Sequence, residues 1–406
     1  MAHHFINKTF YSLCLSTFCL LPCPPRYILI ITTMIITIIF SPGSYSQEKS
    51  ELRGVWLTNI DSEVLFYPEQ TANGINRLAQ LNINTLYPAV WNSGYTLYPS
   101  KVAQNTIGKS IDPSLTLGDR DILQEVINHG HNQNMAVIPW FEFGFMAPAE
   151  SELAKLHPHW LTQRLNGETI WLEGNIHPRV WLNPLHPEVQ QFISDLVVEI
   201  VSKYDVDGIQ FDDHFGYPVD FGYDDWTINL YKQEHNGKMP PQDYQDSEWI
   251  GWRAEKITQY MENLFKSIKI ANPGAIVSVS PNPQGFSLNQ YLLDWETWER
   301  KGLIEELVLQ LYRNNLSDFN RELNQPEVIA ARGHIPVSIG ILTGLKGRPI
   351  PFTQIEEQIE TVREQQFAGV SLFFYESLWN LSTEPPAERL KSFKKVFSAA
   401  VERPRL

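Results

Sequence analysis

Cysteine is almost absent from this chain. The 406 residues contain three cysteines, Cys14, Cys19 and Cys23, and all three lie in the first 23 residues. The remaining sequence therefore excludes a cysteine-ligated zinc site, a CxxC redox centre, a cysteine nucleophile and a small fold held by disulfides.

Charged residues are also scarce, and basic residues are fewer than acidic ones. Charged side chains make up 19% of the chain and hydrophobic ones 43%, which excludes a disordered or fibrous protein. Residues 1–46 contain Lys8 and Arg26 but no acid, so the rest has 30 basic and 46 acidic residues and a net charge of −16. This charge predicts neither nucleic acid nor an anionic membrane surface as a partner.

The longest apolar run, Tyr27–Phe40, is short for a membrane span. It has 14 residues, whereas a spanning helix needs about 20. A helix-breaking Ser-Pro-Gly-Ser and the small residues Ser44-Tyr45-Ser46 follow it, which is typical of a signal peptide. Because an earlier apolar patch, Phe10–Cys23, precedes this run, an uncleaved membrane anchor is the alternative interpretation. We expect residues 1–46 to be one of these two, and the protein to be exported to the periplasm or outside the cell.

The body, residues 47–406, alternates short apolar runs with amphipathic helical stretches. The predicted helices cover residues 71–81, 119–133, 187–203, 248–271, 317–332, 353–365 and 386–400. The eight predicted strands are Arg53–Thr58, Asn84–Trp91, Ala136–Gly144, Asp207–Phe215, Ile276–Pro283, Leu307–Arg313, Ile335–Leu342 and Gly369–Leu378.

Eight strand–helix units in one domain predict an α/β fold, a single (β/α)8 TIM barrel. A doubly wound sheet is the alternative, but no GxGxxG or Walker loop follows the first strand. The longest departure from the repeat is a predicted insertion after strand 3, residues 145–187. Long loops at the carboxyl end of a barrel usually build the binding site.

Two adjacent acids, Asp212 and Asp213, end the fourth predicted strand. Because successive side chains point to opposite faces, Gln210, Asp212 and His214 share one face and Asp213 points with Phe211. If that face lines the barrel, Asp212 is the catalytic candidate and Asp213 a support. The alternative is that both acids cap a helix or hold a loop.

Single acids end two other strands within aromatic runs. Glu142 follows Trp140-Phe141, and Glu376 follows Phe374-Tyr375. Aromatic neighbours desolvate a carboxyl group and raise its pKa, which suits a proton donor near neutral pH. A salt bridge to a barrel arginine is the structural alternative for each.

Aromatic and amide side chains at strand ends predict a sugar site, because flat faces stack on pyranose rings and amides bind hydroxyls. Several of the tryptophans have the alternative of packing helix against sheet. No HExxH or comparable spacing indicates a metal, and no cofactor is expected. The predicted substrate-binding residues are Trp56, Asn59, Trp91, Trp140, Asn183, His214, Asn282, Gln310, Tyr312, Tyr375 and Trp379.

The runs RGVWLT, WLNPLHPEV, DGIQFDDHF, SPNPQG and QLYR together resemble the glycosyl hydrolase-like 10 family of exported bacterial barrels. The resemblance covers residues 51–398 and implies a fold similar to the α-amylase-type glycosidases, with Asp212 as the nucleophile. Some members resemble a hydrolase that cuts peptidoglycan glycan strands stripped of their stem peptides. The chain departs from the α-amylase pattern because its fifth strand has no carboxylate, which leaves Glu142, Glu376 and Asp213 open as the general acid.

The sequence therefore predicts an exported glycoside hydrolase acting on a cell-envelope or extracellular polysaccharide by carboxylate acid–base catalysis. One alternative is a carbohydrate-binding barrel without catalysis, a lectin or envelope scaffold. Another is a metal-dependent deacetylase or phosphoesterase that uses Asp212, Asp213 and His214. The sequence does not determine the oligomeric state.

Overall fold

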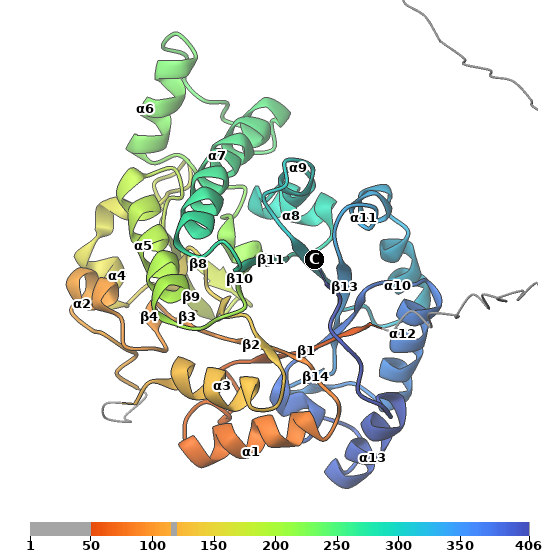
Figure 1. Cartoon of the computed structure of the whole chain (residues 1–406). Helices are drawn as coiled ribbons and strands as arrows, with labels where there is room; N and C mark the ends of the chain where they lie inside the picture. The colour runs from red at the N-terminus through yellow and green to blue at the C-terminus, as the bar shows by residue number, and fades with distance from the viewer. Residues whose placement is uncertain (1–49, 115–119, 406) are drawn as a thin grey trace, which may run out of the picture. The chain divides into compact units, whose positions relative to one another are not determined.

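The computed structural model describes residues 50–114 and 120–405 (Figure 1). The predicted signal peptide or anchor, residues 1–46, lies outside this range. Among the described residues, no helix combines the length and the apolar character needed to cross a membrane.

The described residues form one large parallel sheet of nine strand segments. Its order is β5-β2-β1-β16-β13-β12-β11-β10-β6. Consecutive strands lie next to each other around most of this order, as a series of strand–helix units requires. The segments are β1 (Leu52–Leu57), β2 (Thr85–Pro88), β5 (Ala136–Val137), β6 (Trp140–Phe141), β10 (Gly208–Asp212), β11 (Ile276–Ser280), β12 (Glu306–Gln310), β13 (Val337–Leu342) and β16 (Gly369–Phe373).

The two end segments of this sheet, β5 and β6, are halves of one strand that is interrupted at Ile138 and Pro139. Proline has no N–H to donate, which breaks the regular ladder. The strand stays in place because Ile138 N donates to Leu86 O at 2.9 Å and Gln210 N donates to Pro139 O at 2.8 Å. The sheet therefore has eight positions and closes on itself, which confirms the predicted α/β barrel class.

Helices surround the sheet (Figure 1). The sequence predicted one helix over residues 317–332, but the structure has two helices there. Pro326 disfavours a helical conformation at Gln325, so one helix ends before it and another begins at the proline. The helices following the strands are α1 (Pro68–Ala79), α3 (Ile122–His131), α5 (Pro187–Lys203), α7 (Ser247–Ala271), α10 (Leu316–Leu323), α11 (Pro326–Ala331), α12 (Phe352–Glu364) and α13 (Pro386–Val396).

Further elements lie in the connections that follow strands. Between β6 and α5 the chain forms an antiparallel sheet in the order β7-β9-β8. After β11 it forms α8 (Gln284–Tyr291), a helix the periodicity did not predict. The other elements are β3 (Trp91–Asn92), β4 (Tyr95–Thr96), α2 (Lys101–Ile107), β7 (Met146–Pro148), α4 (Glu152–Leu156), η1 (Pro158–Trp160), β8 (Trp171–Glu173), β9 (His177–Trp181), η2 (Asp213–Phe215), α6 (Asp225–Glu234), α9 (Trp295–Arg300), β14 (Gly344–Leu345), β15 (Arg348–Pro349) and η3 (Tyr375–Leu378).

A buried chain of hydrogen bonds runs through the barrel interior. Trp56 Nε1 donates to Gln210 Oε1 at 2.7 Å, and Gln210 Nε2 donates to Ser278 Oγ at 3.0 Å. Ser278 Oγ donates to Glu306 Oε1 at 2.9 Å. Arg403, from the C-terminal segment, forms an ion pair with the same carboxylate. Gln210 therefore lies inside the barrel, which was the condition for Asp212 as the catalytic candidate.

We predict that Arg403→Met lowers the free energy of unfolding by about 3 kcal/mol, because it leaves the buried Glu306 charge without its cation. Chemical denaturation measures this loss. The double variant Arg403→Met/Glu306→Gln removes the charge but keeps an acceptor for Tyr87 and Ser278. It should recover most of the stability, and equal stability of the single and double variants would contradict the prediction.

Candidate active site

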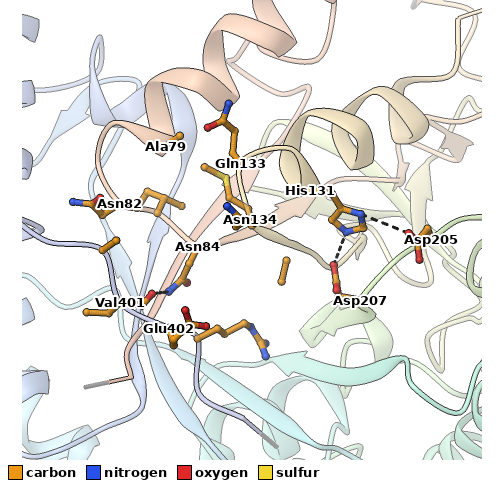
Figure 2. Close-up of a pocket in the computed structure, with 15 residues that line it drawn as sticks. Ala79, Asn82, Asn84, His131, Gln133, Asn134, Asp205, Asp207, Val401 and Glu402 are labelled. Carbon is orange, nitrogen blue, oxygen red and sulfur yellow. Dashed lines mark hydrogen bonds and ion pairs between the residues drawn. The ribbon is translucent and has the colours of Figure 1, made fainter. Parts of the chain in front are cut away.

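Two cavities open at opposite ends of the barrel. The larger, about 1120 Å³, lies at the amino ends of the strands and is lined by polar side chains (Figure 2). Two of its acids already have partners: His131 Nε2 lies 2.9 Å from Asp207 Oδ2, which also accepts from Val137 N at 2.7 Å, and His131 Nδ1 lies 3.7 Å from Asp205 Oδ2. In barrels this end serves stability, whereas catalysis is found at the carboxyl ends of the strands.

The second cavity, about 830 Å³, lies at those carboxyl ends. It brings together Glu142 after β6, Asp212 and Asp213 at the end of β10, and His214. Asn282, after β11, and Gln310, at the end of β12, line it as well. Side chains from four neighbouring strand ends therefore meet in one pocket.

Asp212 is held by three hydrogen bonds. Trp140 Nε1 donates to Oδ2 at 3.1 Å, and the backbone N of His214 donates to Oδ1 at 2.9 Å. The ring atom Nδ1 of His214 lies 3.1 Å from the same Oδ1. Burial lowers the pKa of His214, but the charges of Asp212 and Asp213 outweigh burial and raise it to about 9. An imidazolium therefore faces Asp212 at neutral pH.

Glu142 is partly buried and accepts hydrogen bonds mainly on one oxygen. Asn92 Nδ2 donates to Oε2 at 2.6 Å, and Thr58 Oγ1 lies 2.9 Å from Oε2 and 3.2 Å from Oε1. Burial raises the pKa of Glu142 to about 7, and the nearby charge of Asp212 acts in the same direction. The geometry leaves Oε1 as the atom best placed to carry a proton.

Asp213 has both oxygens occupied. Asn282 donates to Oδ2 from its backbone N at 2.9 Å and from Nδ2 at 2.5 Å, and Ser287 Oγ donates to Oδ1 at 2.5 Å. Burial raises its pKa despite these donors. Strand alternation predicted that Asp213 points with Phe211, but it also lines the pocket. The reason is that the chain leaves the strand at Asp213 and turns into η2.

Glu376 lies elsewhere. It sits in η3 and is not among the residues lining the pocket. Ser62 Oγ donates to its Oε2 at 3.2 Å, and Asn380 Nδ2 donates to its Oε1. The structure therefore brings together three of the four predicted catalytic acids and separates the fourth.

The predicted tryptophans are mostly in the core. Trp56, Trp91 and Trp379 are at most 1% exposed, so their faces are covered by protein. Trp140 lines the pocket, and its indole N–H donates a hydrogen bond to Asp212. Asn183 is buried too, where it donates to Asp224 and Thr227 at 2.9 and 2.8 Å.

Tyr312 carries a buried hydroxyl and, like Asn59, is not among the residues that line the pocket. Within residues 50–114 and 120–405, Tyr312 Oη and Asn59 Oδ1 make no hydrogen bond. Burial raises the pKa of Tyr312, and the charges of Asp212, Asp213 and Glu142 act in the same direction. Tyr375 is outside the pocket lining and packs edge-on against Trp379.

Other residues at the pocket were not predicted. The β8–β9 hairpin contributes Glu173, Ile176, His177 and Arg179, α8 contributes Phe286 and Tyr291, and the β14–β15 hairpin contributes Lys346. The length of the segment after strand 3 was a signal for the first hairpin. Nothing in the local sequence pointed to α8 or to Thr58 as a donor to Glu142, whereas the other donor, Asn92, is one of the amides at strand ends from which a sugar site was predicted.

The described part of the chain contains no group of three or more His, Cys, Asp or Glu side chains that is arranged to hold a metal ion.

Comparison with known proteins gives a consistent picture. The family described as glycosyl hydrolase-like 10 matches residues 51–361. Glycosyl hydrolase DigH of Escherichia coli strain K12 is 25% identical over 327 residues, covering 67% of each chain. Glycosyl hydrolase YngK of Bacillus subtilis strain 168 is 24% identical over 318 residues, covering 70% of this chain and 58% of that protein.

Two solved structures support the fold. The glycoside hydrolase domain of PgaB from Bordetella bronchiseptica has a TM-score of 0.59 and 14% identity, covering 83% of this chain and 100% of that one. The catalytic domain of β-amylase from Paenibacillus polymyxa has a TM-score of 0.57 and 11% identity, covering 85% and 97%.

We predict that Glu142 makes stability depend on pH. Its pKa is raised to about 7 in the native state, so between about pH 4.5 and pH 7 the unfolded chain loses a proton that the native protein keeps. The free energy of unfolding of the wild type should therefore fall relative to Glu142→Gln by about 3 kcal/mol over this range and level off above it. Denaturation of both proteins at a series of pH values measures the difference, and parallel curves would contradict the prediction.

Proposed function

The chain belongs to the glycosyl hydrolase-like 10 family, and we propose that it cleaves glycosidic bonds with Glu142 as general acid and Asp212 as nucleophile or base. The observation that carries the proposal is one pocket with two carboxyl groups in opposite environments. Glu142 has a pKa near 7, and Asp212 faces an imidazolium. Glycoside hydrolysis needs one carboxyl group to protonate the leaving oxygen and another to attack or activate water.

Glu142 fits the acid because it is desolvated and forms no salt bridge with any residue in 50–114 or 120–405. Its Oε2 is engaged by Asn92, and the proton on Oε1 would pass to the leaving oxygen. Asp213 is a poorer acid because Asn282 and Ser287 occupy both its oxygens.

Asp212 fits the nucleophile because its carboxylate is fixed and its charge is balanced. Three donors orient it, and one of them is the His214 ring, whose Nδ1 lies 3.1 Å from Oδ1. Preorganised groups of this kind need no rearrangement as charge develops on the sugar.

We further propose that the substrate is the glycan of peptidoglycan without stem peptides, and that the protein is exported. The substrate proposal rests on the family resemblance. The export proposal rests on the apolar run Tyr27–Phe40 with the small residues behind it. Purified residues 47–406, incubated with peptide-free glycan, intact peptidoglycan and plain polysaccharides, should release products from the first alone, as read by mass spectrometry.

The two catalytic roles predict different responses to the leaving group. Glu142→Gln should slow cleavage of the natural glycan about 100- to 10,000-fold, because nothing protonates the leaving oxygen. With an aryl glycoside, whose phenolate leaves without a proton, the loss should be much smaller. Asp212→Asn should lose activity on both substrates, as measured by initial rates.

Glu376→Gln is the matched control, since this acid lies outside the pocket lining and should keep near-wild-type rates. Equal losses on both substrates for Glu142→Gln would reject its role as acid. If Glu376→Gln showed the leaving-group pattern instead, the acid would be Glu376. Binding of glycan without any cleavage by the wild type would favour the non-catalytic alternative.

We predict that Tyr312→Phe separates activity from stability. Its buried hydroxyl lies near the carboxyl groups and makes no hydrogen bond in the described chain, so removing it should not lower the thermal midpoint. If the hydroxyl binds substrate, as proposed from the sequence, kcat/KM should fall about tenfold. A variant that lost stability without losing kcat/KM would assign Tyr312 a structural role.

A further inference from the structure

Two aromatic side chains of α8 form a row leading away from the catalytic acids. The ring of Tyr291 lies 6.5 Å from the ring of His214, which binds Asp212. The ring of Phe286 lies 5.9 Å from that of Tyr291. Phe286 and Tyr291 both line the catalytic pocket. The row therefore starts beside the reacting groups and extends toward the mouth.

Phe286 is a large apolar side chain that is about half exposed to solvent. It is 48% exposed, and Ile176, at the tip of the β8–β9 hairpin, lines the same pocket and is 71% exposed. Exposed apolar side chains gathered at a cleft mark a binding surface, because folding gains little from leaving them there. Flat aromatic faces beside a glycan-cleaving site suit the apolar face of a pyranose ring.

The helix that carries these aromatics is fastened to the active site. Ser287, next to Phe286, donates to Asp213 at 2.5 Å. At its other end, Tyr217 N donates to Tyr291 O at 2.9 Å. A Cβ atom at Gly216 would lie 1.9 Å from Tyr291 O, so only glycine allows this close approach. The row is thus held rigidly relative to Asp212 and Asp213.

We propose that Phe286 and Tyr291 form a second sugar-binding subsite, which stacks on a ring of the glycan chain beyond the bond being cut and makes the enzyme select long chains. This inference rests on the proposed function. In this proposal Asp213 is a positioning residue, because its carboxylate accepts from Ser287 and so anchors α8, the helix that carries Phe286 and Tyr291. The ligand is a neighbouring sugar of the same chain, because the row is continuous with the pocket that holds the acids.

Chain-length dependence tests the subsite. With purified peptide-free glycan oligosaccharides from disaccharide to octasaccharide, Phe286→Ala should lower kcat/KM about tenfold on the long members and less than about twofold on the shortest one cleaved. Phe286→Trp keeps a flat ring and should retain the preference for long chains, whereas Phe286→Leu, which is apolar but not flat, should lose it. Tyr67→Ala removes an equally exposed aromatic that does not line the pocket and should change nothing.

Equal losses at every length, or none at any length, would overturn the inference. Binding by titration calorimetry in an Asp212→Asn background gives a readout that does not need cleavage. If the wild type cleaves nothing but long chains bind more tightly and depend on Phe286, the proposed function fails and the subsite stands. If long chains bind no more tightly than short ones, the subsite is rejected even if cleavage occurs.

Discussion

Three carboxyl groups in one pocket, two buried and the third partly buried, are the constraint on which the rest of this site depends. Like charges this close cannot all ionise without compensation, and each acid is compensated in a different way. Burial favours the protonated form of Glu142, Asp212 faces the His214 imidazolium, and Asp213 receives neutral donors on both oxygens. Three different environments thus surround chemically similar groups, and the proposed roles of acid, nucleophile or base, and anchor follow this difference.

This division explains why segments far apart in sequence converge at the carboxyl ends of the strands. The donors on Glu142 come from the loop after β1 and from β3, and those on Asp213 come from the loop after β11 and from α8. A closed parallel barrel places all these strand ends around one rim. The barrel brings the acids close together, and the connecting segments provide the different hydrogen-bond donors around each acid.

The sequence was informative wherever a local pattern determines direction. Strand alternation put Gln210 and Asp212 on one face, and Gln210 lies inside the barrel. Alternation failed at Asp213 because the backbone leaves the strand there, which depends on partners from distant residues. The sequence left two alternatives for Trp56 and Trp91, sugar binding or packing between helix and sheet, because an aromatic residue at a strand end gives the same pattern in both cases, and both side chains are buried. Helix α8 was missed because its eight residues form no apolar stripe.

The absence of an acid on the fifth strand has a physical reason in this structure. Asn282 occupies the position just after β11 and places Nδ2 at 2.5 Å from Asp213 Oδ2. A carboxylate at that position would face Asp213 oxygen to oxygen, so the two would have to share a proton. An amide donates instead and keeps the anchor of α8 intact. In the proposed mechanism the proton donor therefore comes from another strand end, and Glu142 on the third strand is the acid that Thr58 and Asn92 bind in a desolvated site.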